Sequence, residues 1–273
     1  MDPLAAGEPE GVALQGQARI APAEPFALKG CVVIPDEAIE DGYVVISEAT
    51  ITDVTRTPPT DMRLADTNGV ILPGLIDLHG HPEYNVFSPW EPPRLFSNRY
   101  QWRASEEYAA VVKGPWALLT EETDERPSLL RALTRYAEAR ALIGGTTAIQ
   151  GASGVYPDPH ESLVRNVDRY IFGAHIGRSI IDLGRTRPED VGRLKQQIED
   201  GLVGALYIHL AEGIDESSRR EFEELEEVGL LTPATVIIHG TALDDNQLER
   251  VKEAGAKLVW SPQSNLRLYG ETT

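Results

Sequence analysis

The chain has 273 residues, enough for one large domain or for a large domain and a small one. Its 41% hydrophobic content excludes general disorder, and no apolar stretch approaches the roughly 20 residues of a membrane-spanning helix. The formal net charge of −18 argues against binding to nucleic acids or anionic membranes, because their phosphates would be repelled. The single cysteine, Cys31, excludes an intrachain disulfide. The start of the chain lacks a secretory signal pattern, so we expect a cytoplasmic protein.

The first quarter of the chain contains two kinds of sequence. Residues 1–25 are rich in Ala, Gly, Pro and Glu without periodicity, which predicts a flexible tail. Short β-rich runs follow at residues 27–34, 42–46 and 50–54, with turn residues between them. This pattern predicts a small antiparallel sheet within residues 26–68.

From residue 69 onward, expected strands and helices alternate along the chain. Strands are expected at residues 75–78, 146–150, 205–208, 235–238 and 257–260, and helices at residues 128–142, 188–201, 216–228 and 244–255. Such alternation indicates parallel strands joined by crossover helices, in either a doubly wound sheet or a closed (β/α)₈ barrel.

Two segments interrupt this alternation. Residues 82–127 are aromatic and Pro-rich, and we interpret them as either a functional loop or a satellite hydrophobic cluster. Residues 169–181 hold the third and fourth strands of the series, unless one of these strands is irregular. His175, in the second segment, either faces the pocket or is structural, and we interpret it as structural. We assign no site role to His160, which lies in a Pro-rich loop before that segment.

Four of the six histidines directly follow expected strands, namely His79, His81, His209 and His239. The carboxyl ends of parallel strands meet at one edge of a sheet, where sites are commonly built. His79 and His81 are two residues apart and can point to the same side, while Gly80 allows close backbone approach. Because imidazole suits zinc, iron or nickel, the pattern predicts a metal site.

Glu212 follows His209 by three residues, where an expected strand gives way to a loop. A carboxylate at this position can take a proton from water and pass it to a leaving nitrogen. Glutamates are common on the surface of an acidic protein, so the position beside a candidate ligand is what distinguishes this one.

Motifs at the successive strand ends resemble those of the amidohydrolase superfamily, from about Phe26 to the last residue. They are Pro73–His81, Gly144–Ala148, His209–Glu212, Ile238–Gly240 and Ser261–Asn265. The last motif is similar to that of the branch with chlorohydrolases, guanine and cytosine deaminases and imidazolonepropionase. The resemblance implies a metal-dependent hydrolase of non-peptide C–N bonds in a small-molecule substrate, either cyclic amide or amidine, by ring opening, deamination or dechlorination.

The resemblance also implies a fold and a set of site residues. The fold is a (β/α)₈ TIM-type barrel with a small β-sandwich domain, and the cofactor is one divalent metal ion, zinc or iron. The implied metal ligands are His79, His81 and His209, joined in the family by an eighth-strand Asp. Glu212 matches the proton shuttle, and His239 matches the residue that orients the attacking water. Ser264 and Asn265 either shape the substrate pocket or form a structural turn.

The sequence departs from the family pattern in two ways. Lys195, on an expected helix, is the only lysine between Lys113 and Lys252, which disfavours the branch whose two metals share a carboxylated lysine. The sequence ends before an eighth strand, so we expect a barrel at residues 69–273 that lacks its last strand, and part of the sandwich at residues 26–68. Exposed strand edges would favour a homo-oligomer. The alternatives to an enzyme are an inactive truncated fragment and a non-catalytic scaffold homologue.

Overall fold

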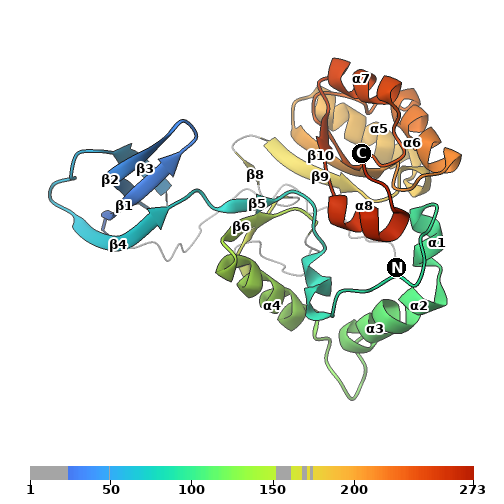
Figure 1. The fold of residues 1–273 in the computed structure, drawn as a ribbon, viewed down its shortest axis with the longest axis horizontal. Helices are drawn as coiled ribbons and strands as arrows, with labels where there is room; N and C mark the ends of the chain where they lie inside the picture. The colour runs from blue at the N-terminus through green and yellow to red at the C-terminus, as the bar shows by residue number, and fades with distance from the viewer. Residues whose placement is uncertain (1–23, 49, 152–160, 168–170, 173–174) are drawn as a thin grey trace. The chain divides into compact units, whose positions relative to one another are not determined.

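A computed structural model describes residues 24–48, 50–151, 161–167, 171–172 and 175–273 (Figure 1). The chain divides into two compact units, one ending at Pro73 and the other beginning at Gly74. Most of the expected tail, His160 and the side chain of His175 lie outside the described part of the chain. The helices within that part are all too short or too polar to cross a lipid bilayer.

The first unit contains a four-stranded sheet in the order β3-β2-β1-β4. Its strands are β1 (Phe26–Ile34), β2 (Glu37–Ser47), β3 (Thr50–Thr55) and β4 (Arg63–Ile71). β2 pairs antiparallel with both β1 and β3, as expected from the β-rich runs. β4 pairs in parallel with β1 and was not predicted, because most of its side chains are exposed and its sequence shows no apolar alternation.

The second unit contains two separate sets of hydrogen-bonded strands. One is a parallel sheet of β5 (Leu75–Asp77), β6 (Thr146–Ile149) and β7 (Arg165–Asn166). β7 therefore lies before residues 169–181, where we expected the third strand. That segment instead holds β8 (Ile171–Phe172), which pairs antiparallel with β9 (His175–Ile180).

The larger sheet of this unit has the order β12-β11-β10-β9-β8. Its remaining strands are β10 (Val203–Leu210), β11 (Thr235–His239) and β12 (Lys257–Val259). β9, β10, β11 and β12 pair in parallel with one another, whereas β8 at the edge is antiparallel to β9. The expected alternation of helices with parallel strands is thus confirmed for this part of the chain.

Helices occupy the connections between these strands, and a further helix follows β12. They are α4 (Leu130–Ile143), the short η5 (Leu183–Arg185), α5 (Pro188–Glu199), α6 (Glu216–Glu227), α7 (Asp245–Glu253) and α8 (Pro262–Tyr269). α5 begins with a proline, which suits the first helical turn. The expected capping box of α7 is present, since Asp244 and Gln247 exchange side-chain and backbone hydrogen bonds.

The main hydrophobic core lies between β10, β11 and the helices α5, α6 and α7. Fully enclosed side chains include Leu206, Ile208, Phe222, Leu225 and Ile237. β10 reads as an almost continuous apolar run, as is typical of a parallel strand covered on both faces. Side-chain packing in the core therefore holds the end of β10 in place, which it cannot do for a strand with exposed faces.

The Pro-rich segment after β5 folds into short helical turns around aromatic side chains. They are η2 (Pro82–Val86), α1 (Arg99–Arg103), α2 (Glu106–Tyr108), the π-helical turn η3 (Ala109–Lys113) and α3 (Gly114–Thr120). The Trp90 ring lies 6.1 Å from that of Phe96, 6.4 Å from Trp102 and 5.3 Å from Tyr108, between ring centroids. The segment thus contains the satellite cluster that was one of our two interpretations.

Candidate metal centre

The three expected metal ligands come together at the ends of β5 and β10. His79, His81 and His209 each offer a ring nitrogen, and these nitrogens all lie within 4.8 Å of one another. Nε2 of His79 is 3.1 Å from Nε2 of His209. Two nitrogens bound tetrahedrally to one zinc ion would lie roughly 3.3 Å apart. The spacing and the donor set therefore fit a shared metal ion.

Backbone hydrogen bonds after β5 hold the His-Gly-His turn against β6. The Gln150 N–H donates to the Asp77 carbonyl at 2.8 Å, and the Gly80 N–H donates to the Gln150 carbonyl at 3.1 Å. The Asp77 carboxylate accepts the His79 N–H at 3.1 Å. A Cβ at Gly80 would lie 2.9 Å from Asp77 Oδ2 and 3.5 Å from the Gln150 carbonyl oxygen, so the turn is closely packed around this glycine.

The ends of β10 and β11 turn sharply through left-handed backbone conformations. Ala211 has φ 52° and His239 has φ 73°, values uncommon for residues other than glycine. The Gly240 N–H donates to the Leu210 carbonyl at 3.0 Å and joins the two turns. The His239 ring lies 4.7 Å from the ring of His79 and 5.5 Å from that of His209, between centroids. Strained turns of this kind often occur at functional sites.

Glu212 is buried beside the histidines, with 5% of its surface exposed. Its Oε2 atom lies 3.6 Å from Nε2 of His239. Its Oε1 atom accepts a 2.8 Å hydrogen bond from the Tyr269 hydroxyl, which in turn accepts one from Trp102 Nε1 at 2.8 Å. Burial and the charge of Glu212 raise the pKa of Tyr269, so the phenol keeps the proton that it donates. Sequence analysis missed both aromatic residues, and no motif marks them.

The Ser261–Asn265 motif supplies partners for two of the histidines. Ser261 Oγ lies 2.8 Å from Nδ1 of His79, and Asn265 Oδ1 lies 2.8 Å from Nδ1 of His239. Because an amide oxygen only accepts, Nδ1 of His239 is the donor in this hydrogen bond, and Nε2 is the ring nitrogen that lies near Glu212. Asn265 is fully buried, whereas the Ser264 hydroxyl donates to the Ser261 carbonyl at 3.2 Å within its own helix.

The environment of His79 and His209 favours the neutral form of these two rings. Burial, followed by the charges of His239 and His81, lowers the pKa of His79 to about 2. Burial and the neighbouring histidines also lower the pKa of His209 well below its ordinary value. Neutral imidazole is the form that binds a metal ion, so these rings are ready to act as ligands.

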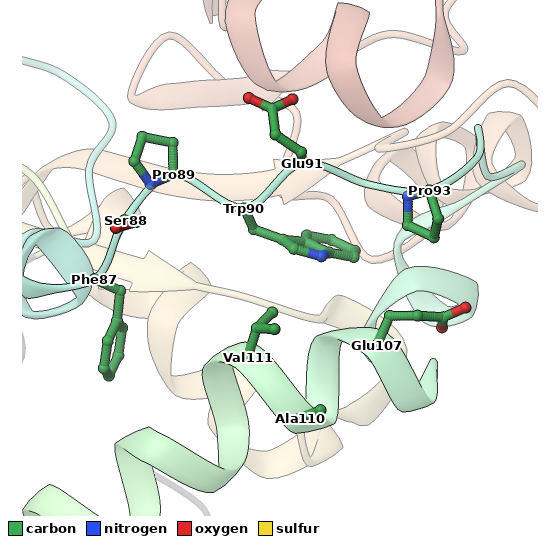
Figure 2. A pocket seen from close by; sticks show the side chains of 9 residues that line it. All are labelled: Phe87, Ser88, Pro89, Trp90, Glu91, Pro93, Glu107, Ala110 and Val111. Atoms are coloured by element: carbon green, nitrogen blue, oxygen red, sulfur yellow. The ribbon is translucent and has the colours of Figure 1, made fainter.

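A cavity of about 760 Å³ lies within the segment that follows β5. It is lined mainly by apolar and aromatic groups, from Phe87, Ser88, Pro89, Trp90, Glu91, Pro93, Glu107, Ala110 and Val111. Figure 2 shows the Trp90 ring projecting toward the helical turns that carry Ala110 and Val111. Phe87 lies 6.5 Å from Tyr84, whose ring is 6.4 Å from His81, between centroids. Ring contacts thus run from the cavity wall to one of the candidate ligands.

Comparison with curated proteins finds relatives that are named as deaminases of adenosine derivatives. The chain is 24% identical to the 5-methylthioadenosine/S-adenosylhomocysteine deaminase of Haloarcula marismortui, over 88% of this chain and 62% of that protein. It is 24% identical to the 5'-deoxyadenosine deaminase of Methanothermobacter thermautotrophicus, over 90% of this chain and 64% of that protein. The chain therefore spans less than two thirds of the length of these relatives. No family model matches it.

Comparison with solved structures finds proteins whose fold is similar to that of this chain. The atrazine chlorohydrolase of Arthrobacter aurescens TC1, complexed with zinc, aligns with a TM-score of 0.67 and 17% identity. The alignment covers 89% of this chain and 67% of that structure. The deaminase relatives, the fold and the strand-end motifs agree with the resemblance to the amidohydrolase superfamily.

Proposed function

We propose that this chain carries the metal centre of a metal-dependent hydrolase that cleaves C–N bonds other than peptide bonds. The observation that carries the proposal is the grouping of three imidazole nitrogens within 4.8 Å of one another, beside a buried carboxylate. Glu212 lies 3.6 Å from His239, so an acid–base group adjoins the candidate ligands. This arrangement suits hydrolysis by activated water.

The reaction we favour is deamination of an amino-substituted heterocycle, a cyclic amidine. The support comes from the two relatives named as deaminases of adenosine derivatives. Dechlorination, as in the name of the chlorohydrolase, and ring opening are the alternatives. All three reactions place a nucleophilic oxygen on a carbon of an electron-poor ring or carbonyl group.

We propose that His79, His81 and His209 hold one divalent ion, zinc, and that the two parallel sheets are arcs of one (β/α)₈ barrel. A zinc complex of a protein with a similar fold supports both parts of this proposal. Such an ion, when bound, supplies Lewis acidity that makes water nucleophilic at neutral pH.

The chain's own side chains then move and position protons. Glu212 takes a proton from the attacking water and delivers it to the leaving nitrogen. His239 offers Nε2 as an acceptor that orients the same water, because Asn265 holds the proton on Nδ1. Tyr269 occupies Oε1 of Glu212, which leaves Oε2, on the side of His239, for proton transfer.

The test is deamination by the zinc-loaded chain, measured as ammonia release from 5'-deoxyadenosine, 5-methylthioadenosine and S-adenosylhomocysteine. Glu212→Gln keeps the size of the side chain and removes the base, so turnover is expected to fall by about 10²- to 10⁴-fold. Bound zinc, measured by elemental analysis, is expected to stay unchanged. Glu227→Gln, on the exposed face of α6, is the matched control. Activity that survives Glu212→Gln would show that this residue is not the proton shuttle.

A further inference from the structure

Arg99 is an arginine buried to 2% exposure at the start of α1, in the segment after β5. Buried guanidinium groups need partners for their charge and for their N–H groups. The charge is met by Glu221 in α6 at 3.0 Å and by Asp182 at 3.7 Å. The proposed reaction uses none of these side chains. Arg99 and Glu221 nevertheless contact the backbone of the turn that carries His209 and Glu212, which the reaction does use.

Both the backbone and the side chain of Arg99 bind the end of β10. Its Nη1 donates to the His209 carbonyl at 3.2 Å, and its backbone N–H donates to the Glu212 carbonyl at 3.1 Å. Glu221 completes the set, since its Oε2 accepts the Ala211 N–H at 2.8 Å. Hydrogen bonds from one ion pair therefore reach His209, Ala211 and Glu212.

The neighbouring backbone is paired closely with the same turn. The Ile214 N–H donates to the Ser97 carbonyl at 2.7 Å, and Asn98 forms a β-bridge with Gly213. A Cβ at Gly213 would lie 2.5 Å from the Ser97 carbonyl oxygen, so only glycine permits this approach. The segment after β5 thus reaches the end of β10 and lies against it.

We propose that Arg99 and Glu221 are a positioning pair, which holds the His209–Glu212 turn in the shape that the metal ligand and the proton-transfer carboxylate require. The inference rests on the proposed function of those two residues. The turn needs such support because Ala211 is held at φ 52°, a conformation that costs free energy in an alanine. A buried ion pair is itself weak evidence for stability, whereas its bonds to these particular backbone groups serve the site.

The experiment titrates the metal-free chain with Co²⁺ at pH 8 and records both the dissociation constant and the visible spectrum of the bound ion. The spectrum reports coordination geometry, which a loss of overall stability alone would not alter. The titration is run at pH 8, above the pKa of Glu221, which burial raises to about 7 against the effect of Arg99. Arg99→Met and Glu221→Leu remove the pair, and Arg193→Met, in a partly exposed ion pair with Asp190, is the matched control.

Arg99→Met and Glu221→Leu are expected to weaken Co²⁺ binding by about 10- to 100-fold and to change the spectrum. Glu221→Gln keeps an acceptor for the Ala211 N–H, so this variant is expected to bind Co²⁺ more tightly than the Glu221→Leu variant. The Arg193→Met control is expected to match the unaltered chain. Unchanged affinity and spectrum in Arg99→Met and Glu221→Leu would overturn the positioning role.

Two further comparisons keep the outcome decisive. If circular dichroism shows that Arg99→Met and Glu221→Leu do not fold, Arg99→Lys takes their place. It keeps the charge beside Glu221 but cannot reach both the carboxylate and the His209 carbonyl, so weaker Co²⁺ binding is expected and unchanged binding overturns the proposal. Failure of the unaltered chain to bind Co²⁺ would instead overturn the proposed function, which separates the two claims.

Discussion

His209 and His81 belong to one group of candidate metal ligands, yet the two strand ends that carry them are built very differently. β10 is buried along most of its length and His209 is 7% exposed. The three residues of β5 are all exposed, with Leu75 and Ile76 at 60%, and His81 is exposed too. One half of the site is therefore part of the hydrophobic core, and the other half is held mainly by backbone hydrogen bonds.

This difference predicts how changes at the two ends will act. A side chain at the end of β10 contributes both to metal binding and to the packing of the core, so its loss affects two properties. The exposed His81 side chain has less buried surface to lose, so its loss is expected to affect metal binding more than the packing of the fold. Metal affinity and unfolding free energy, measured on the same variants, separate the two behaviours.

The largest contrast is expected between His209→Ala and His81→Ala. Both variants are expected to lose bound zinc. In metal-free protein, His209→Ala should lower the unfolding free energy by about 1–3 kcal/mol, because it removes a buried side chain. His81→Ala should change it by no more than about 0.5 kcal/mol. Urea unfolding of both variants in the presence of a chelator measures this, and equal losses would show that the β5 end is packed as firmly as β10.

A second contrast comes from pH. The pKa of His79 is about 2 in the folded chain, against an ordinary 6.5, so below pH 6.5 the unfolded chain takes a proton that the folded ring refuses. Stability from this group is present above pH 6.5 and is lost as pH falls toward 2, by up to about 1.4 kcal/mol per pH unit. The His79→Ala variant should lack the part of this pH-dependent loss of unfolding free energy that comes from His79. Urea unfolding of both metal-free proteins at pH 7, 6 and 5 tests this, and parallel curves would contradict it.

The ends of β10 and β11 were predictable from the sequence because each buried parallel strand is a run of apolar residues, and the run ends where the polar site residues begin. His209, Glu212 and His239 each stand at such a stop. β7 was missed because it consists only of Arg165 and Asn166, which carry no apolar signal. Short strands of this kind exist through pairing with a neighbour and not through their own composition.

The contacts that orient the site residues were not predictable in the same way. Tyr269 and Glu212 are 57 residues apart in the chain, and Arg99 is 110 residues from the His209 carbonyl that it binds. Nothing local in the sequence marks such pairs, since an aromatic or a basic residue in a loop is ordinarily exposed or part of a cluster. The candidate ligands could be predicted from sequence motifs. The contacts that orient them could not, because these contacts depend on how the segment after β5 folds back against β10.

A third contrast tests the buried support of Glu212. Tyr269→Phe removes the hydroxyl that donates to Oε1, and it leaves Trp102 Nε1 without its acceptor. We expect the unfolding free energy to fall by about 1 kcal/mol and turnover to fall as well, with bound zinc unchanged. Tyr136→Phe, on a half-exposed ring in α4, is the control. Thermal unfolding and ammonia release measure the two effects, and a variant with full turnover would show that Glu212 does not need this donor.

The smallest effect on stability is expected on the β5 side. Ser261→Ala removes the hydroxyl 2.8 Å from Nδ1 of His79, in a partly exposed position, so the unfolding free energy should change by less than about 0.5 kcal/mol. The His79 ring loses the partner that fixes its orientation, and zinc affinity should fall by about tenfold. Ser264→Ala, whose hydroxyl bonds only within α8 in the contacts described, is the control for zinc affinity. If Ser261→Ala destabilised the fold as much as Tyr269→Phe, the exposed half of the site would be joined to the core, and the division between the two strand ends would be wrong.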